Sequence, residues 1–178
     1  PAWVALAYPR VQAVEAAAIA EKVDPDLALA IARTESFFAT DVRSGAGAGG
    51  LMQLMPATAQ QLRRDDEPGL EEGILFDPVM NARLGTRYLG MLSMDFGGRP
   101  DLVAAAYNGG PSNARRFYLR GRDLPLDVFM ETVPFRETRG YIRRVLEAQL
   151  NYAATDGRAR HPGALTPVVA DIGDSVAF

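Results

Sequence analysis

The sequence contains no cysteine and a single histidine, His161. Without cysteine, the chain forms no disulfide and offers no thiol nucleophile, thiolate zinc site or iron–sulfur cluster. One histidine all but excludes a Ser-His-Asp triad and a histidine-rich metal site. Proton chemistry must therefore rest on carboxylates, tyrosines or arginines, and we expect neither a metal nor a cofactor.

Long apolar runs and basic patches are also missing. No run approaches the ~20 apolar residues of a transmembrane helix, and the start at Pro1 lacks the basic and apolar regions of a signal peptide. The formal net charge is −3, with the arginines spread along the chain, whereas nucleic-acid-binding domains carry a basic face. We expect no membrane span and no nucleic-acid partner.

The 178 residues suit one domain with a tail. Abundant alanine, leucine, arginine and glutamate favour helix, and no segment alternates as a strand does. We predict a mainly α domain of roughly seven to nine helices over residues 1–154. Residues 155–178, rich in glycine, proline and alanine, are expected to form an extended or poorly ordered tail.

Apolar spacing and helix start and stop signals locate most of these helices. Asp24-Pro25 and Asp77-Pro78 are typical helix starts. Any sheet is expected to be a small irregular piece near residues 51–55. The first helix should bury Val11, Val14, Ala18 and Ile19. Helices are predicted over residues 11–22, 24–38, 56–62, 77–96, 101–107, 113–118 and 136–152, with a short piece that ends before Pro134.

Glu35 is the first candidate for acid–base chemistry. Leu27, Ile31 and Glu35 stand at i, i+4 and i+8, so a helix places the carboxyl in line with two apolar side chains. Desolvation favours the protonated form of a carboxyl, which is the form that a general acid needs near neutral pH. The alternative is a glutamate at a helix end that reaches water past Phe37 or Phe38.

A glycine-rich stretch follows this helix. Gly45, Gly47 and Gly50 match the spacing G-x-G-x-x-G, but no βαβ unit surrounds them, so a dinucleotide site is rejected. We interpret the stretch as a tight backbone path that lets main-chain groups approach a ligand. A flexible surface loop would not explain the apolar residues 51–55 that follow at once.

Four segments in order resemble the soluble lytic transglycosylases, bacterial relatives of goose-type lysozyme. The match runs collinearly from about Tyr8 to Tyr152, and the last segment is similar to the closing motif of the Slt-type branch. Gly49 stands where many members carry serine, and Thr34 where glutamine is common. The segments are Glu35-Ser36 with Ser44 and residues 47–56; Asp77-Pro78 with Asn81, Gly85-Thr86 and Tyr88-Leu89; residues 105–111; and residues 131–141.

The resemblance implies a lysozyme-like helical domain with a saccharide-binding cleft and a reaction on peptidoglycan glycan strands. Members of this family cleave the β-1,4 bond between N-acetylmuramic acid and N-acetylglucosamine without water, leaving a 1,6-anhydromuramoyl end. By this similarity Glu35 acts first as acid and then as base, and the substrate's acetamido group supplies the second function. It also implies export to the periplasm or cell envelope, with a signal peptide and N-terminal region outside this segment.

The same resemblance assigns further roles. It implies that Tyr107 hydrogen-bonds near the catalytic carboxyl, while Glu137 either faces the cleft or only suits the helix dipole. Met52 is expected to serve packing, and Asp41 and Glu131 are expected to be structural. The positions that match sugar-subsite residues are Ser44, Gln53, Met55 and Asn108.

Two other functions stay open at this stage. A hydrolytic muramidase on the same fold would need a positioned water and normally a second carboxylate. A noncatalytic glycan-binding module would need no acid, and the presence of Glu35 disfavours it. The sequence names no protein partner.

Overall fold

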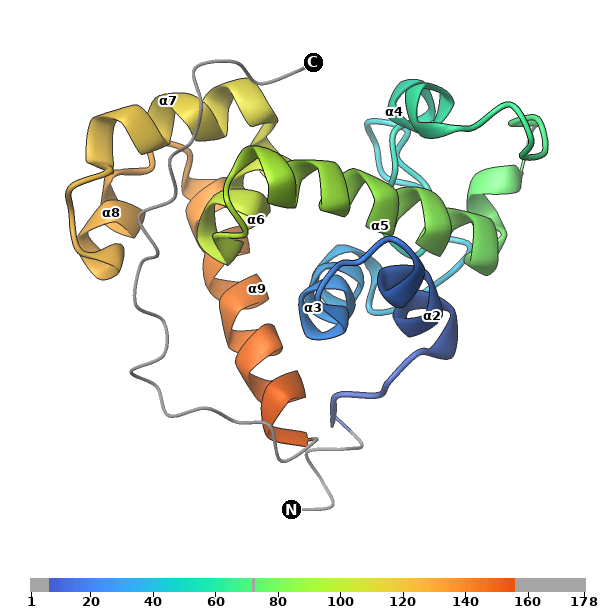
Figure 1. Ribbon diagram of the computed structural model, residues 1–178, viewed down its shortest axis with the longest axis horizontal. Helices are drawn as coiled ribbons and strands as arrows, with labels where there is room; N and C mark the ends of the chain where they lie inside the picture. Colours follow the sequence, from blue (N-terminus) through green and yellow to red (C-terminus); the bar gives the residue numbers. More distant parts are fainter. Residues whose placement is uncertain (1–6, 72, 156–178) are drawn as a thin grey trace. The chain divides into compact units, whose positions relative to one another are not determined.

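The computed structural model describes residues 7–71 and 73–155. Within these ranges the chain forms eight α-helices, one 3-10 helix and no strand (Figure 1), so the predicted mainly α fold is confirmed. None of the helices described is both long and apolar enough to cross a membrane. The tail predicted over residues 155–178 lies, from residue 156 onward, outside the described residues.

The chain divides into two compact units, the first ending at Gly90 and the second beginning at Met91. This boundary falls inside the longest helix of the middle of the chain, α5. The elements in chain order are α2 Gln12–Ala20, α3 Pro25–Ser36, α4 Pro56–Leu62, η1 Ile74–Phe76, α5 Pro78–Asp95, α6 Pro100–Gly109, α7 Pro111–Gly121, α8 Leu126–Thr132 and α9 Arg136–Thr155.

In the first unit, α2 and α3 lie side by side (Figure 1). The predicted start of α3 is confirmed: Asp24 accepts a hydrogen bond from the backbone N–H of Asp26 over 3.0 Å, and Pro25 needs no partner for the N–H it lacks. Val14 and Ala18 of α2 are buried, but Ile19 is 69% exposed. The predicted stripe is therefore wrong at Ile19, because one face of a nine-residue helix buries only a narrow line.

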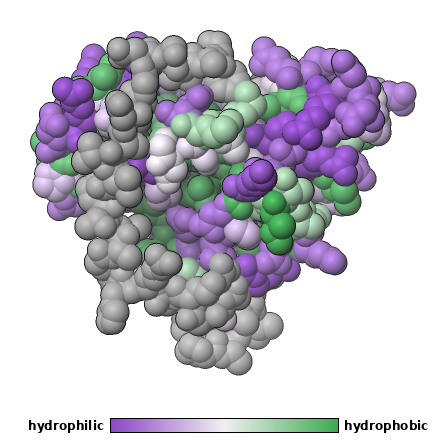
Figure 2. Space-filling view, in the orientation of Figure 1, coloured by the Kyte–Doolittle hydropathy of each residue, from purple (hydrophilic) through white to green (hydrophobic). Residues whose placement is uncertain are grey.

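The segment after α3 forms a folded loop instead of a sheet. Two isolated antiparallel bridges, Arg43 with Gly49 and Gly49 with Leu54, are its only extended pairings in the described range, so no strand forms at residues 51–55. The next segment includes η1, a short 3-10 helix inside the stretch that leads to α5, which the periodicity does not predict. Figure 2 shows a mostly hydrophilic surface over α4 and the polar loop that follows it.

In the second unit, α6 packs against both α7 and α9 (Figure 1). Three consecutive alanines, residues 104–106, are fully buried on α6, which allows neighbouring helices to approach closely. Helices are predicted over residues 101–107 and 113–118, yet α7 begins at Pro111 and not at Asn113. The cause is that proline suits the first helical turn, where its missing N–H would have no partner. Phe117 and Phe135 pack edge to face with ring centroids 5.5 Å apart.

Candidate active site

Glu35 lies in the last turn of α3 and is half-buried. Ile31 and Leu27, one and two turns earlier on the same line, are buried, as the sequence predicts. Phe37 is 72% exposed, and its ring lies 4.8 Å from the guanidinium of Arg33, four residues before it. The helix thus leaves the Glu35 carboxyl at the border between core and surface, where partial desolvation acts on it.

The chain turns sharply directly after Glu35 and Ser36. Phe37 and Phe38 adopt left-handed backbone conformations, with φ of 51° and 65°, which cost about 1–2 kcal/mol each for residues other than glycine. Such strain persists only where surrounding contacts hold it, and it gathers at functional sites. One such contact is the hydroxyl of Ser36, which donates a 2.7 Å hydrogen bond to the carbonyl of Leu51.

Ser44 closes a turn in the glycine-rich loop. Its backbone N–H donates to the carbonyl of Ala48 over 2.8 Å, and its hydroxyl accepts a 3.0 Å bond from the N–H of Ala48. The side chain is half-buried. The structure therefore gives Ser44 a local role in shaping the loop, and its contact with substrate remains a prediction.

Gln53 has a left-handed backbone, with φ of 47°. Its side-chain nitrogen donates to the carbonyl oxygens of Val42 and Gly50 over 3.0 and 2.9 Å, which uses both of its N–H donors. Its amide oxygen accepts no hydrogen bond from the described residues and can therefore serve as a preset acceptor. Met55 is 42% exposed whereas Met52 is fully buried, which confirms Met52 as a packing residue.

The loop is fastened to α5 by residues that sequence reasoning did not place in the site. Asn81 is fully buried and hydrogen-bonded to two groups of the loop, at Gly49 and Met52, and to the Leu75 carbonyl of η1. Gly85, one turn later, leaves room for Met52, since an added Cβ would lie 2.4 Å from the Met52 sulfur. Both belong to the segment that resembles the family. An asparagine beside an apolar stripe is the sequence signal that could have identified Asn81.

The second unit holds further predicted residues, at the end of α6 and in the first turn of α9. Tyr107 and Asn108 are half-buried near the end of α6, and the Asn108 side-chain oxygen accepts a 2.8 Å bond from the hydroxyl of Thr138. Gly109 lets the helices meet, because its Cβ would lie 3.3 Å from that same hydroxyl oxygen. Glu137, next to Thr138, is exposed in the first turn of α9.

The predicted site residues thus fall into two sets, each inside one unit. The first set surrounds the end of α3 and the glycine-rich loop, and the second occupies the junction of α6 with α9. Among the described residues, no group of three or more histidine, aspartate or glutamate side chains could hold a metal ion. The first set comprises Glu35, Ser44, Gln53 and Met55, and the second Tyr107, Asn108 and Glu137.

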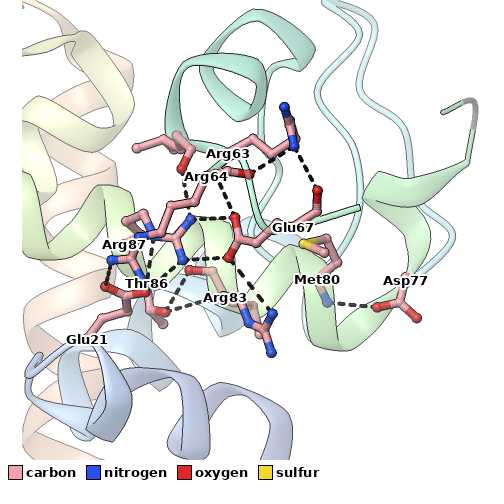
Figure 3. Close-up of polar contacts among 11 residues, drawn as sticks. Glu21, Arg63, Arg64, Glu67, Asp77, Met80, Arg83, Thr86 and Arg87 are labelled. Atoms are coloured by element: carbon pink, nitrogen blue, oxygen red, sulfur yellow. Dashed lines mark hydrogen bonds and ion pairs between the residues drawn. The ribbon is translucent and has the colours of Figure 1, made fainter. Parts of the chain in front are cut away.

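A separate charge cluster in the first unit joins three elements (Figure 3). Arg87 on α5 contacts Glu67 in the loop after α4 and Glu21 after α2, with N–O distances of 2.7 and 3.0 Å. The hydrogen bond from Arg87 holds the pKa of Glu67 at about 2, below its ordinary 4.5, and these carboxylates raise the pKa of Arg87. The residues border a cavity of about 630 Å³. Because each carboxylate is paired, the cluster serves to anchor the polar loop after α4.

Comparison with known proteins gives a consistent set of likenesses. The family described as Transglycosylase SLT domain matches residues 12–123. Soluble lytic murein transglycosylase of Escherichia coli (strain K12) is 39% identical over 136 residues, which are 74% of this chain and 21% of that protein. The chain therefore spans about a fifth of the length of the curated relatives it matches.

Two solved structures share the fold. An inactive glutamate-to-glutamine mutant of lytic transglycosylase Slt from Pseudomonas aeruginosa has a TM-score of 0.81 at 36% identity, covering 88% of this chain and 26% of that one. The 70 kDa soluble lytic transglycosylase SLT70 from Escherichia coli has a TM-score of 0.80 at 33% identity, covering 86% and 26%. These likenesses confirm the expected mainly α, lysozyme-like fold.

Proposed function

The chain belongs to the transglycosylase SLT domain family, and on that premise we propose that it is a peptidoglycan lytic transglycosylase with Glu35 as acid and base. The observation that carries this proposal is the place of Glu35: a half-buried carboxyl at the end of α3, one residue before the serine that binds the glycine-rich loop. The relatives named above as lytic murein transglycosylases support the same activity.

In the first step, the protonated carboxyl of Glu35 donates its proton to the oxygen between N-acetylmuramic acid and N-acetylglucosamine. The bond from this oxygen to the anomeric carbon breaks, and its electron pair stays on the departing oxygen. The substrate's acetamido oxygen then forms a bond to the anomeric carbon and so takes up the positive charge that develops there. The half-buried place of Glu35 at the end of α3 supports this step.

In the second step, the Glu35 carboxylate removes the proton of the muramoyl 6-hydroxyl. That oxygen attacks the anomeric carbon and closes the 1,6-anhydro ring, and the bond to the acetamido oxygen breaks. No water enters the product, and Glu35 ends protonated as it began. A single carboxylate suffices for this sequence. In residues 36–60 the only acid is Asp41, which is exposed, so that stretch offers no buried second carboxylate.

The other predicted residues are assigned to substrate and transition state. Tyr107 is the second catalytic residue, whose phenol serves the reacting carboxyl. Gln53 presents its free amide oxygen to a sugar hydroxyl, and Met55 offers an exposed apolar surface. Asn108 and Glu137 bind the glycan or its peptide, with Asn108 held in place by Thr138. Ser44 shapes the loop and lines the same subsite.

The substrate places the protein in the periplasm or cell envelope, where peptidoglycan glycan strands are present. A relative that is inactive as a glutamate-to-glutamine mutant supports the reliance on one glutamate. Because the chain spans about a fifth of its relatives, these statements concern the reaction of this domain.

The test is digestion of purified sacculi by the parent chain, by Glu35→Gln and by Glu147→Gln. Glu147 is exposed on α9 and has no assigned role, so its variant is the control. We expect the parent and Glu147→Gln to release muropeptides lighter by one water than reducing-end products, and Glu35→Gln to release none. Equal release by Glu35→Gln would refute the assignment, and reducing ends would identify a hydrolytic muramidase. No release by any variant would favour the glycan-binding module.

A further inference from the structure

One peptide group, between Leu51 and Met52, is held at both of its polar ends by side chains from different helices. Its carbonyl oxygen accepts a 2.7 Å hydrogen bond from the hydroxyl of Ser36 at the end of α3. Its N–H donates a 2.8 Å hydrogen bond to the side-chain oxygen of Asn81 in the first turn of α5. Because a peptide group is planar and rigid, a rotation imposed at one end reaches the other.

Asn81 makes two further hydrogen bonds, one to the loop and one to η1. Its side-chain nitrogen donates 2.8 Å hydrogen bonds to the carbonyl oxygens of Gly49 and Leu75. The amide therefore uses both N–H donors and one acceptor position while fully buried, which leaves it no freedom to rotate. Gly50 lies between these bonds, with φ of 76°, and an added Cβ there would lie 2.0 Å from the Leu75 carbonyl oxygen.

The connections of Asn81 lead to the proposed reaction on two sides. On one side, the Leu51–Met52 peptide binds Ser36, the neighbour of Glu35. On the other side, Met52 is followed by Gln53, whose strained backbone and bonds to Val42 and Gly50 depend on the same loop shape. A buried asparagine that served stability alone would need no such connection to both the acid and the predicted subsite.

We propose that Asn81 is a positioning residue: through the Leu51–Met52 peptide it sets the loop that carries Gln53 relative to the helix end that carries Glu35. The proposal rests on the proposed function of Glu35 and adds a residue that acts without touching substrate. Preorganisation of this kind matters because a misplacement of about 1 Å can lower turnover by roughly a hundredfold.

Asn81→Asp is the most informative variant. Aspartate keeps an oxygen for the Met52 N–H, but it loses both donors and sets a carboxylate oxygen against the Gly49 and Leu75 carbonyls. We expect kcat/KM on soluble peptidoglycan strands to fall about tenfold or more, with a lower kcat from the displaced Glu35 and a higher KM from the displaced Gln53. The assay is run at a temperature where circular dichroism shows the variant fully folded.

Two controls separate positioning from stability. Thr86→Val removes a buried hydroxyl on the same helix whose bonds go only to the carbonyls of Ala82 and Arg83. Val14→Ala lowers stability through the buried core of α2. Both should keep the parent kcat and KM while folded. If Asn81→Asp also keeps them, Asn81 is only structural and the proposal is overturned.

A double-mutant cycle tests the shared peptide directly. If Ser36 and Asn81 act through one peptide group, the effects of Ser36→Ala and Asn81→Asp are coupled. The kcat/KM of the double variant should then fall little below that of the less active single variant. Fold-changes that simply multiply would show independent action and overturn the proposal.

Hydrogen exchange makes the outcome independent of the proposed function. If the parent chain releases no product, the proposed function fails. The hydrogen-exchange rate of the Met52 amide then still tests whether Asn81 positions the loop. The Met52 amide should exchange at least tenfold faster in Asn81→Asp, and the amides of Ser36 and Gln53 should also exchange faster. In Thr86→Val the exchange of these amides should stay unchanged. Unchanged exchange of these amides in Asn81→Asp would overturn the positioning role.

Discussion

The carboxylate of Glu67 receives two hydrogen bonds from the guanidinium of Arg87, of 2.8 and 2.7 Å, one on each carboxylate oxygen (Figure 3). Both side chains are more than nine-tenths buried. Paired guanidinium and carboxylate groups of this geometry are among the stronger polar contacts in proteins. The two hydrogen bonds between Arg87 and Glu67 fix the polar loop after α4 onto α5. The helix periodicity of the sequence does not predict this contact.

This pair predicts a specific dependence of stability on pH. The pKa of Glu67 is lowered from 4.5 to about 2, so its contribution is fully present above pH 4.5 and is lost as the pH falls through 2. At 1.36 kcal/mol per pKa unit the contribution is on the order of 3 kcal/mol. Urea unfolding should show Glu67→Gln less stable than the parent at pH 7, with the gap narrowing between pH 4.5 and 2. Glu71→Gln, exposed on the same loop, should show no such gap.

Two glycines of the glycine-rich loop should differ sharply in their tolerance of alanine. At Gly50 an added Cβ meets the Leu75 carbonyl oxygen at 2.0 Å and the Asn81 nitrogen at 2.4 Å, whereas at Gly47, which also has a positive φ, it meets nothing within 4 Å. Gly47→Ala should therefore cost only the backbone strain, about 1–2 kcal/mol, and Gly50→Ala more than about 3 kcal/mol. Equal losses in chemical denaturation would contradict the steric argument.

The bond between Thr138 and Asn108 should matter to both stability and substrate binding. Thr138→Val removes the donor and leaves the Asn108 oxygen without it, which should cost about 1–2 kcal/mol in unfolding free energy. If Asn108 binds the glycan, KM should also rise. Thr132→Val is the matched control, because Thr132 is an exposed residue whose hydroxyl donates to the Phe129 carbonyl of its own helix. A parent-like KM in Thr138→Val would argue against Asn108 as a binding residue.

Tyr107→Phe should separate catalysis from packing. The change keeps the ring and removes only the phenol oxygen, so we expect kcat to fall about tenfold to a hundredfold while the melting temperature shifts by a few degrees at most. Tyr118→Phe is the control: its ring, buried 5.8 Å from the guanidinium of Arg99, keeps that contact, and turnover should be unchanged. Full activity in Tyr107→Phe would remove Tyr107 from the catalytic residues.

Helix starts were the most predictable part of the fold. Proline after a capping residue at Pro25, and proline at Pro56, correctly predict where α3 and α4 begin, because proline's fixed φ suits only the first turn. Ile19 was predicted wrongly because spacing shows which residues share a face but not how far the neighbouring helix covers it. The predicted start of the next helix at residue 113 is also wrong, because α7 begins at Pro111.

The candidate site was predictable as a set of residue types but not as a set of contacts. The line from Leu27 to Glu35 follows from helix geometry, and the exposure of Met55 agrees with a subsite role without testing it. By contrast, the bonds of Gln53 to Val42 and Gly50 arise from a folded loop that no period encodes. The role of Asn81 depends on two partners distant in sequence, Gly49 and Met52, so only the tertiary structure reveals it.

The tip of the glycine-rich loop offers a position for site-specific labelling. Gly45 and Gly47 have open space around them and Ala46 between them is exposed, whereas the base of the loop has no room for a single added carbon at Gly50. Because the chain has no cysteine, Ala46→Cys would introduce its sole thiol. A fluorophore attached there would sense glycan arriving beside the loop without disturbing the Asn81 bonds that shape it.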